Sequence, residues 1–331
     1  MNQVILLNKH PVGKPTLANF KFITEDMPVA GEGEVLLKTK YVSVDPYLRG
    51  RMSDTKSYVP SFELNKPIQS ALIAEVMECG NNALFKKGDF LTGHLDWKEY
   101  QVSKGKGLTR IDAPEDQLTP YLGILGMTGL TAYLGLTEIG APKPGETLVV
   151  SGAAGAVGSV VGQIGKLLGC TVVGITGSDK KAALLLSKFG FDQVVNYKTA
   201  NLPEAVKKAC PNGVDIYFDN VGGEISDAVL AHINKFARLP VCGTIALYNE
   251  TKMPMGPRLQ TLLVIKSALM KGFIISDYYE KFPVAQRQLA VWLKEGKLSF
   301  QETVVEGFNN IPAAFMDLFE GKNEGKMIVK I

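Results

Sequence analysis

Residues 146–159 read Glu146-Thr-Leu-Val-Val-Ser-Gly-Ala-Ala-Gly-Ala-Val-Gly-Ser159, an apolar run that passes directly into three glycines at intervals of three. The run predicts a buried strand, and the residues from Gly158 onward predict a helix. Glycine lets the backbone turn tightly and approach a pyrophosphate, while the first turn of a helix offers free N–H groups to an anion. The segment therefore predicts a dinucleotide-binding turn. Its spacing is G-x-x-G-x-x-G rather than the usual G-x-G-x-x-G, and a plain tight turn is the alternative.

The residues around and beyond this turn alternate between short β-branched runs and helical patterns. Such alternation is typical of a doubly wound α/β fold, in which a parallel sheet carries helices on both faces. The expected strands are 147–150, 171–176, 193–197, 214–218, 237–242 and 269–275. The expected helices are 157–168, 179–189, 203–210, 224–234, 258–267 and 282–295. We therefore expect a Rossmann sheet in the middle of the chain.

The two ends of the chain have a different pattern. Residues 1 to roughly 120 are β-rich, with expected strands at 34–43, 71–77 and 89–93 separated by turn-rich segments. The last 35 residues return to short β runs, with one helix at 312–320 and a final strand at 326–331. These parts predict a second, β-rich domain.

Composition excludes several classes of protein. The chain has 331 residues, of which 46% are hydrophobic and 21% charged, as in ordinary globular proteins. A net charge of +3 does not favour binding to nucleic acid or to an anionic membrane. The uncharged stretches 118–137 and 147–165 are long enough for membrane helices, but glycines interrupt both, so we expect buried core. With no signal-peptide pattern, we expect a cytoplasmic protein with no membrane and no nucleic-acid partner.

Cysteine and histidine do not form a metal-binding pattern. The four cysteines stand at 79, 170, 210 and 242, and the three histidines at 10, 94 and 232. None forms a Cys-x-x-Cys or His-Glu-x-x-His motif, so we expect no metal site.

The segment Gly177-Ser178-Asp179-Lys180-Lys181, at the end of the second expected strand, should choose the nucleotide. A carboxylate at this place binds the ribose hydroxyls of NAD, whereas small and basic residues such as Ser178 and Lys181 suit the 2′-phosphate of NADP. Asp179 is equally suited to the first turn of a helix, and the lysines can belong to a solvated helix face. We predict NADP(H).

Three further residues are candidates for the site. Asn220 and Tyr248 each follow an expected strand, at the carboxyl edge that faces the cofactor in a doubly wound sheet. Asn220 can bind ribose or the nicotinamide amide, and an Asx turn is the alternative. Tyr248 can donate a proton or a hydrogen bond to a substrate oxygen, although a half-buried structural tyrosine is the commoner case. Asp45-Pro46 predicts a turn that places Tyr47 on a loop.

The order of these parts resembles the medium-chain dehydrogenase/reductase superfamily, and within it the zinc-free group of 2-alkenal and alkenone double-bond reductases. The matching motifs span residues 44 to 326, nearly the whole chain. They are Val44-Asp-Pro-Tyr-Leu-Arg49, Gly126-Met-Thr-Gly-Leu-Thr-Ala-Tyr133, Ala153-Ala-Gly-Ala-Val-Gly158, Tyr217-Phe-Asp-Asn-Val-Gly-Gly223, Cys242-Gly243 with Tyr248-Asn249, and Gly325-Lys326.

The resemblance implies both a domain organisation and an activity. Residues 1–122 and 298–331 would form a β-rich, GroES-like catalytic domain, and residues 123–297 a Rossmann NADP-binding domain. The activity would be NADPH-dependent, metal-free reduction of the C=C bond of a small α,β-unsaturated aldehyde or ketone, an enal or enone, with hydride added at the β-carbon. An NADPH quinone reductase of the same superfamily and a non-catalytic NADP-binding sensor remain alternatives.

The resemblance also implies roles for individual residues. The pyrophosphate would be lined by Gly155, Ala156, Val157 and Gly158. Lys181 and Tyr197, beside Ser178, would flank the adenosine 2′-phosphate. The nicotinamide half would be held by Asn220, Cys242, Gly243, Thr244, Ile245, Ala246, Leu247, Tyr248, Phe273, Ile274, Ile275 and Asn323. Tyr248 would assist protonation, and Tyr47 would contact the substrate.

The expected strand 269–275 also bears on assembly. It is apolar and should be the last strand of the parallel sheet. An exposed apolar sheet edge tends to pair with its own copy, so we expect a homodimer.

Overall fold

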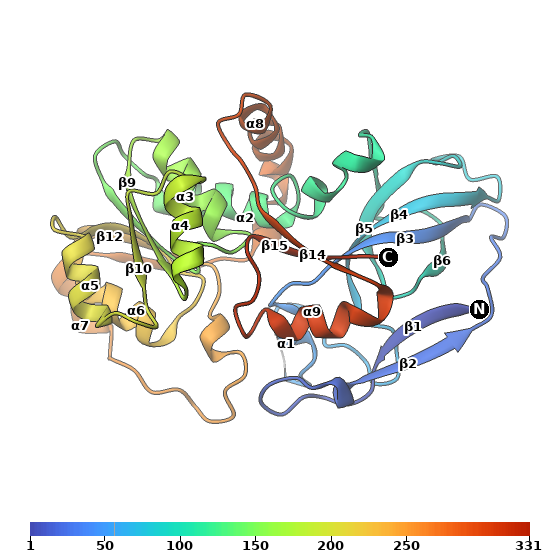
Figure 1. The fold of residues 1–331 in the computed structure, drawn as a ribbon, viewed down its shortest axis with the longest axis horizontal. Coiled ribbons are helices and arrows are strands. Elements are labelled where there is room, and N and C mark those ends of the chain that lie inside the picture. The colour runs from blue at the N-terminus through green and yellow to red at the C-terminus, as the bar shows by residue number, and fades with distance from the viewer. Residues whose placement is uncertain (56) are drawn as a thin grey trace. The chain divides into compact units, whose positions relative to one another are not determined.

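The computed structural model describes residues 1–55 and 57–331, which form two compact units (Figure 1). The first unit comprises Met1–Leu122, Glu302–Asn323 and Met327–Ile331. The second comprises Gly123–Gln301 and the short segment Glu324–Lys326. The chain thus builds most of the first unit, then the second, and completes both with its last 30 residues.

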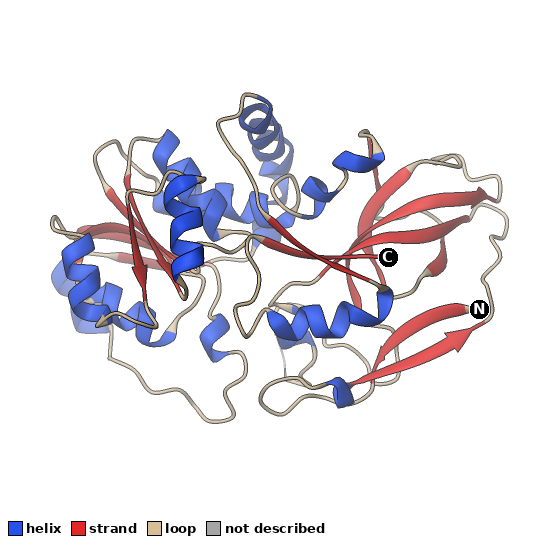
Figure 2. Ribbon diagram, viewed as in Figure 1, coloured by secondary structure: helices blue, strands red, loops and turns tan. Residues whose placement is uncertain are grey.

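The first unit is β-rich, as expected, and its strands form two sheets (Figure 2). One is an antiparallel pair of β1 (Asn2–Leu7) and β2 (Phe20–Glu25). The other has seven strands in the order β14-β15-β3-β4-β5-β7, with β6 paired to β3. Its strands are β3 (Val35–Ser43), β4 (Gln69–Cys79), β5 (Phe90–Asp96), β6 (Tyr100–Ser103), β7 (Thr109–Ile111), β14 (Glu302–Glu306) and β15 (Lys326–Lys330).

Short helices connect these strands, and one apolar core holds the unit together. The helices are η1 (Leu17–Asn19), α1 (Leu48–Arg51), η2 (Glu115–Gln117), η3 (Thr119–Leu122), η7 (Phe308–Asn310) and α9 (Ile311–Asp317). Phe315 of α9 packs in the same core as Leu37 of β3 and Trp97. Trp97 is fully buried and donates its indole N–H to Ser70 Oγ at 2.8 Å, which satisfies its polar atom inside the core.

The second unit contains a six-stranded parallel sheet in the order β10-β9-β8-β11-β12-β13. Numbered from β8, this is the 3-2-1-4-5-6 order of the doubly wound dinucleotide-binding fold. The strands are β8 (Thr147–Ser151), β9 (Thr171–Thr176), β10 (Gln193–Asn196), β11 (Val214–Phe218), β12 (Ile233–Val241) and β13 (Leu269–Gly272). The predicted Rossmann fold class is confirmed. The order reverses between β8 and β11, where such folds bind their ligands beyond the carboxyl ends of the strands.

Helices cover both faces of this sheet. They are α2 (Met127–Gly135), η4 (Leu136–Gly140), α3 (Gly158–Leu167), α4 (Asp179–Ser187), α5 (Leu202–Ala209), α6 (Gly223–Leu230), η5 (Ile245–Leu247), α7 (Gln260–Lys266), η6 (Ile275–Lys281) and α8 (Phe282–Lys294). Successive residues of a strand point to opposite faces. Accordingly, Leu148 and Val150 pack in one core with α3 and α8, whereas Val149 packs in the other with α5 and α6.

Several predicted element boundaries are wrong, among them the start of the strand expected over 237–242, which begins at Ile233, and the end of the helix expected over 312–320, which is Asp317. Two others have a clear physical reason. The helix expected over 224–234 ends at Leu230, because the chain must turn for Ile233 to enter β12 beside Val214. The strand expected over 269–275 ends at Gly272, because Phe273 leaves the sheet edge and its ring packs against Phe218. In both cases burial of an apolar residue outweighs the local pattern.

Within the described residues, no single helix is long and apolar enough to cross a membrane. One bent pair, Glu115–Leu122 with Met127–Gly140, passes the same test of length and composition.

Candidate active site

The glycine turn, residues 152–158, joins β8 to α3 at the carboxyl edge of the parallel sheet. Gly152 has a φ of 58°, a conformation that favours glycine, and its carbonyl accepts the Gly155 N–H at 2.9 Å. A Cβ at Gly158 would overlap the Gly152 carbonyl oxygen and lie 2.8 Å from the Ala153 Cα. The sequence therefore needs glycine here to bring two backbone segments together at the start of a ten-residue helix.

The turn exposes backbone donors. Within residues 1–55 and 57–331, no hydrogen-bond acceptor is found for the amides of Ala156, Val157 and Gly158. These three N–H groups and the positive end of the α3 dipole make an anion site of the kind that binds a pyrophosphate. The structure thus brings together the residues expected to line that group.

A segment from the far end of the chain closes on this turn. The Gly325 N–H donates to the Ala154 carbonyl at 2.8 Å, and Gly325 forms a parallel bridge with Gly155. Gly325 has a φ of 66°, and a Cβ there would overlap the Gln301 carbonyl. The motif Gly325-Lys326 marks this position in the sequence, but its contact with the glycine turn depends on tertiary structure.

A second group of residues gathers where β9 and β10 end. Ser178 caps α4, and its Oγ accepts the Lys181 N–H at 3.3 Å. The Tyr197 ring lies so close to Gly177 that a Cβ there would be 2.9 Å from its Cε1. Burial lowers the pKa of Lys181; Glu324 opposes this shift and the charge of Lys198 adds to it. Ser178, Lys181 and Tyr197 are therefore neighbours, as a 2′-phosphate site requires.

Asp179 has a structural partner in this cluster. Asn196, the last residue of β10, donates its side-chain N–H to Asp179 Oδ1 at 2.8 Å. Asp179 is thus a first-turn carboxylate of α4 tied to the adjacent strand, the alternative that the sequence left open. Lys198 and Glu324 were not predicted. Lys198 follows Tyr197 directly, which is a usable signal, whereas Glu324 reaches Lys180 (2.7 Å) only through the fold.

The buried carboxylate of Asp219 organises the end of β11. Its Oδ1 accepts hydrogen bonds from Ser151 Oγ (2.9 Å), Tyr217 Oη (2.8 Å) and the amides of Val221 (3.0 Å) and Gly222 (2.9 Å). Burial, reinforced by the Asp219 charge, raises the pKa of Tyr217, which therefore stays a donor. The sequence indicated this segment through Asn220 but gave Asp219 no role.

Asn220 itself joins β11 to β8. Its backbone N–H donates to Ser151 Oγ at 2.9 Å, and its side-chain N–H donates to the Ser151 carbonyl at 2.8 Å. The amide group is thereby fixed at the point where the strand order reverses. Its predicted contact with the cofactor stays a prediction, and the Oδ1 atom is the acceptor suited to it.

The loop of residues 242–248 follows β12 at the same edge. The amides of Cys242 and Gly243 donate to the Asp219 carbonyl at 2.8 and 3.2 Å, and the Ala246 amide donates to the Val221 carbonyl at 3.1 Å. Thr244 N–H donates to Tyr248 Oη at 3.5 Å, so the tyrosine folds back over its own loop. The structure thus gathers all seven residues of the predicted loop next to Asn220.

Phe273, Ile274 and Ile275 lie beyond β13 rather than within it. Phe273 stacks edge-to-face on Phe218, with ring centroids 6.2 Å apart, and its amide donates to the Val241 carbonyl at 3.4 Å. Ile274 is extended and caps η6, which Ile275 opens. These three residues therefore belong to the segment in which the chain passes from β13 to η6.

Tyr47 and Asn323 belong to the first unit. Tyr47 precedes α1, and its Oη lies 3.3 Å from His94 Nε2. Arg49, next in the same turn, donates to the carbonyls of Pro11 (3.2 Å) and Gly13 (3.0 Å) and so holds the turn in place. Asn323 is the residue at which the chain leaves the first unit for Glu324.

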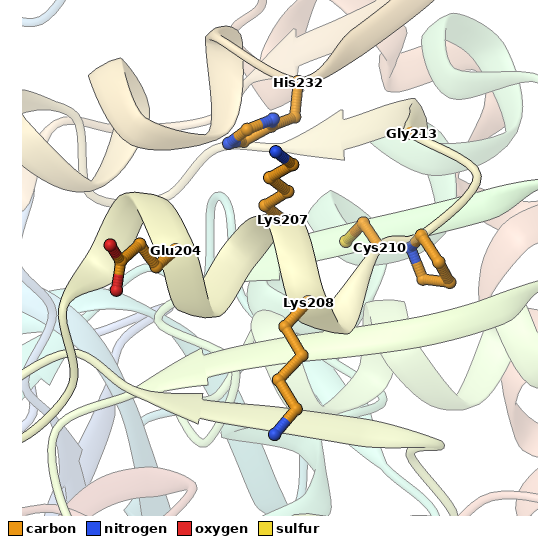
Figure 3. Close-up of a pocket in the computed structure, with 7 residues that line it drawn as sticks. Glu204, Lys207, Lys208, Cys210, Gly213 and His232 are labelled. Carbon is orange, nitrogen blue, oxygen red and sulfur yellow. The ribbon is translucent and has the colours of Figure 1, made fainter.

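A pocket of about 550 Å³ lies elsewhere in the second unit (Figure 3). It is lined by Glu204, Lys207, Lys208, Cys210, Pro211, Gly213 and His232. Gly213 immediately precedes β11, so this pocket is at the amino edge of the sheet, opposite the glycine turn. Burial raises the pKa of the Cys210 thiol to about 11, which leaves it unreactive at neutral pH.

No group of three or more His, Cys, Asp or Glu side chains placed to hold a metal ion occurs in the part of the chain that the structure describes.

Comparison with known proteins gives the family. Residues 3–111 match the N-terminal domain of oxidoreductases, and residues 156–290 match the family described as zinc-binding dehydrogenase. The NADPH-dependent curcumin reductase of Escherichia coli is 42% identical and the prostaglandin reductase 1 of Sus scrofa 44% identical; the alignments cover 100% and 98% of this chain and 97% of each relative. The NADP(+)-dependent 2-alkenal reductase of Nicotiana tabacum is 41% identical over 100% of this chain and 97% of its own.

A solved structure agrees with these relatives. The CurA protein of Vibrio vulnificus, in complex with NADPH, is 42% identical and superposes with a TM-score of 0.95 over 99% of this chain and 98% of that one. The chain belongs to the medium-chain dehydrogenase/reductase superfamily, and within it to the group of alkenal and alkenone reductases. The resemblance found in the sequence is thus confirmed.

Proposed function

We propose that this protein is an NADPH-dependent reductase that saturates the C=C bond of α,β-unsaturated aldehydes and ketones. The observation that carries the proposal is membership of the alkenal and alkenone reductase group together with an anion-binding glycine turn. Curcumin, prostaglandin and 2-alkenal reductases differ in the size of their named substrates. Their membership of one group of reductases supports the reaction class, whereas the difference in substrate size leaves the physiological substrate open.

The residues of the second unit fit an NADP-type dinucleotide. The amides of Ala156, Val157 and Gly158 have no acceptor among the described residues and can donate to a pyrophosphate, and glycine at 158 places no Cβ against the Gly152 carbonyl. Lys181, next to Ser178 and Tyr197, supplies a cation for a 2′-phosphate. Asp179, which could have bound the hydroxyls of NAD, is instead bonded to Asn196. The site therefore favours NADPH over NADH.

The bound cofactor supplies a hydride to the β-carbon of the substrate. Negative charge then develops on the carbonyl oxygen, and a nearby hydrogen-bond donor stabilises it. Tyr248 carries a phenol O–H at the carboxyl edge of the sheet, and we assign to it the stabilisation of that oxygen or the delivery of a proton to the α-carbon. Tyr47 is assigned to contact with the substrate.

The direct test is NADPH consumption with a 2-alkenal or 2-alkenone, followed by identification of the product. A saturated aldehyde or ketone supports the proposal. An allylic alcohol shows reduction of the carbonyl instead and contradicts it. Parallel assays with quinones and with NADH separate an alkenone reductase from a quinone reductase, and tight NADPH binding without turnover identifies a sensor.

We also propose that the protein is a homodimer. β13 is the last strand of the parallel sheet, as predicted, and Leu269 on it is 49% exposed. The adjacent helix α7 exposes Val264 (78%) and Ile265 (68%). An apolar strand edge beside an apolar helix face favours pairing with a second copy. Light scattering should give twice the mass of the 35.9 kDa chain, and a monomer would contradict the proposal.

A further inference from the structure

A hydrogen bond in the first unit joins Tyr47 to His94, a residue with no role in the reaction above. Tyr47 stands at the start of α1, and His94 lies in β5. Their Oη and Nε2 atoms are 3.3 Å apart. The pair thus connects a residue assigned to the substrate with a group whose charge can change near neutral pH.

Three described groups set the electrostatics around the pair: Asp45, Arg51 and Tyr58. Burial raises the pKa of the Tyr47 phenol well above its usual range, so the hydroxyl keeps its hydrogen. Burial lowers the pKa of His94; the positive charge of Arg51 lowers it further, and Asp45 opposes both. His94 is therefore neutral at pH 7 and gains its proton only at a pH below the usual range of a histidine.

Arg51 is fixed in place, so its influence on His94 is constant. Its Nε donates to the Pro60 carbonyl at 3.0 Å, and its guanidinium lies 4.0 Å from the centroid of the Phe62 ring. A cation over an aromatic face is additionally stabilised.

The protonation state of His94 decides the direction of the hydrogen bond. A neutral imidazole nitrogen is a far better acceptor than a phenol oxygen, so neutral His94 accepts the Tyr47 O–H at Nε2. In the protonated imidazolium both ring nitrogens carry hydrogen. Nε2–H must then donate to the Tyr47 oxygen, and the phenol hydrogen becomes available to another acceptor.

We propose that His94 is a positioning residue, which decides whether Tyr47 offers a hydrogen-bond donor or only an acceptor to the carbonyl oxygen of the substrate. With His94 protonated, Tyr47 O–H binds that oxygen. With His94 neutral, the hydrogen stays on the histidine side and the substrate is held less well. The role in substrate binding rests on the proposed reductase function, whereas the coupling between the two side chains does not.

The coupling is tested first by NMR titration of the imidazole groups, without cofactor or substrate. The chain has three histidines, and His94→Gln identifies the His94 signal by its loss. In Tyr47→Phe, the protonated imidazole loses the phenol oxygen that accepts its Nε2–H, and this charge-assisted bond is stronger than the one that the neutral ring loses. The pKa of His94 should therefore fall by about half a unit, while the other two histidine signals stay in place. An unchanged or higher pKa for His94 would overturn the proposal.

The role in binding is tested by the pH dependence of kinetics with 3-penten-2-one and saturating NADPH. The KM should rise about threefold as the pH is raised through the pKa of His94 found in the NMR titration, with little change in kcat. His94→Gln should give a KM that does not vary with pH, and His232→Gln, in the other unit, should keep the wild-type profile. A His94→Gln variant with the wild-type profile overturns the proposal. Absence of any alkenone turnover refutes the proposed function instead, and the NMR titration still decides the coupling.

Discussion

The glycine turn after β8 and the loop after β12 lie at the same edge of one sheet, but they present different groups to a bound molecule. In the glycine turn, three backbone amides have no acceptor among the described residues, and the side chains are small. In the loop of residues 242–248, the amides of Cys242, Gly243 and Ala246 are bonded to the end of β11, so the groups assigned to the chemistry are side chains such as Tyr248. The glycine turn is thus suited to bind an anion through its backbone, and the loop is suited to take part in the reaction through its side chains. We therefore expect that adding an atom to the glycine turn weakens cofactor binding, and that removing an atom from a side chain of the loop lowers the reaction rate.

The largest effect is expected from Tyr248→Phe, which removes one oxygen from the loop. If the phenol acts as acid or donor, kcat should fall by about 100-fold or more, while the NADPH Kd changes little. Steady-state kinetics and calorimetry measure the two quantities. Tyr279→Phe, at a side chain that is 74% exposed, is the matched control. An unchanged kcat would remove Tyr248 from the reaction.

The next effect is expected from Gly158→Ala, which adds one carbon to the turn. The new Cβ would overlap the Gly152 carbonyl, a strain of about 1–3 kcal/mol, so the NADPH Kd should rise by about 10-fold to 100-fold. Gly256→Ala, outside the turn, is the control, because its Cβ would lie no nearer than 3.8 Å to another atom, Asp227 Oδ2. Equal affinities for both variants would show that the close approach at Gly158 does not matter for binding.

Lys181→Ala tests the charge at the end of β9. Loss of a charge-assisted hydrogen bond of about 1.5 kcal/mol should weaken NADPH binding about tenfold and leave NADH binding unchanged. Lys180→Ala removes the neighbouring charge, whose side chain is 81% exposed and paired with Glu324, and should have little effect. If both variants weaken NADPH binding equally, the lysines contribute general positive charge to binding rather than a specific contact.

The smallest effect is expected from thiol alkylation at neutral pH. Burial raises the pKa of Cys242 to about 12, so this thiol in the loop stays protonated and unreactive. Cys79 is exposed and should react first, without loss of activity. Peptide mass spectrometry identifies the modified residue, and early labelling of Cys242 would show that the loop opens in solution.

The parts of the fold that follow from short stretches of sequence were predictable. β8, the glycine turn and α3 come from 21 consecutive residues, and strand–helix alternation predicts the parallel sheet without knowledge of its contacts. The boundaries of elements that are set by distant contacts could not be predicted in this way. α6 ends early because Ile233 pairs beside Val214, which no local pattern indicates.

The residues of the candidate site also fall into those that local sequence predicts and those that depend on distant contacts. Ser178 and Asn220 each lie two residues beyond a strand, and Lys181 lies in the first turn of the helix that follows β9, so their place at the carboxyl edge could be predicted. The hydrogen bonds of Asp219 connect β8 with β11, and those of His94 connect β5 with the Tyr47 turn, so both depend on strand order and register. The functional roles of the predicted residues stay predictions until the variants are measured.

The contact between Gly325 and Ala154 has a consequence for synthesis of the protein. The turn that would receive the dinucleotide is translated about 170 residues before its backbone partner Gly325. A nascent chain on the ribosome therefore carries an incomplete cradle until Gly325 has left the exit tunnel. Coenzyme added to stalled nascent chains should protect the turn from proteolysis only when residue 325 has left the exit tunnel.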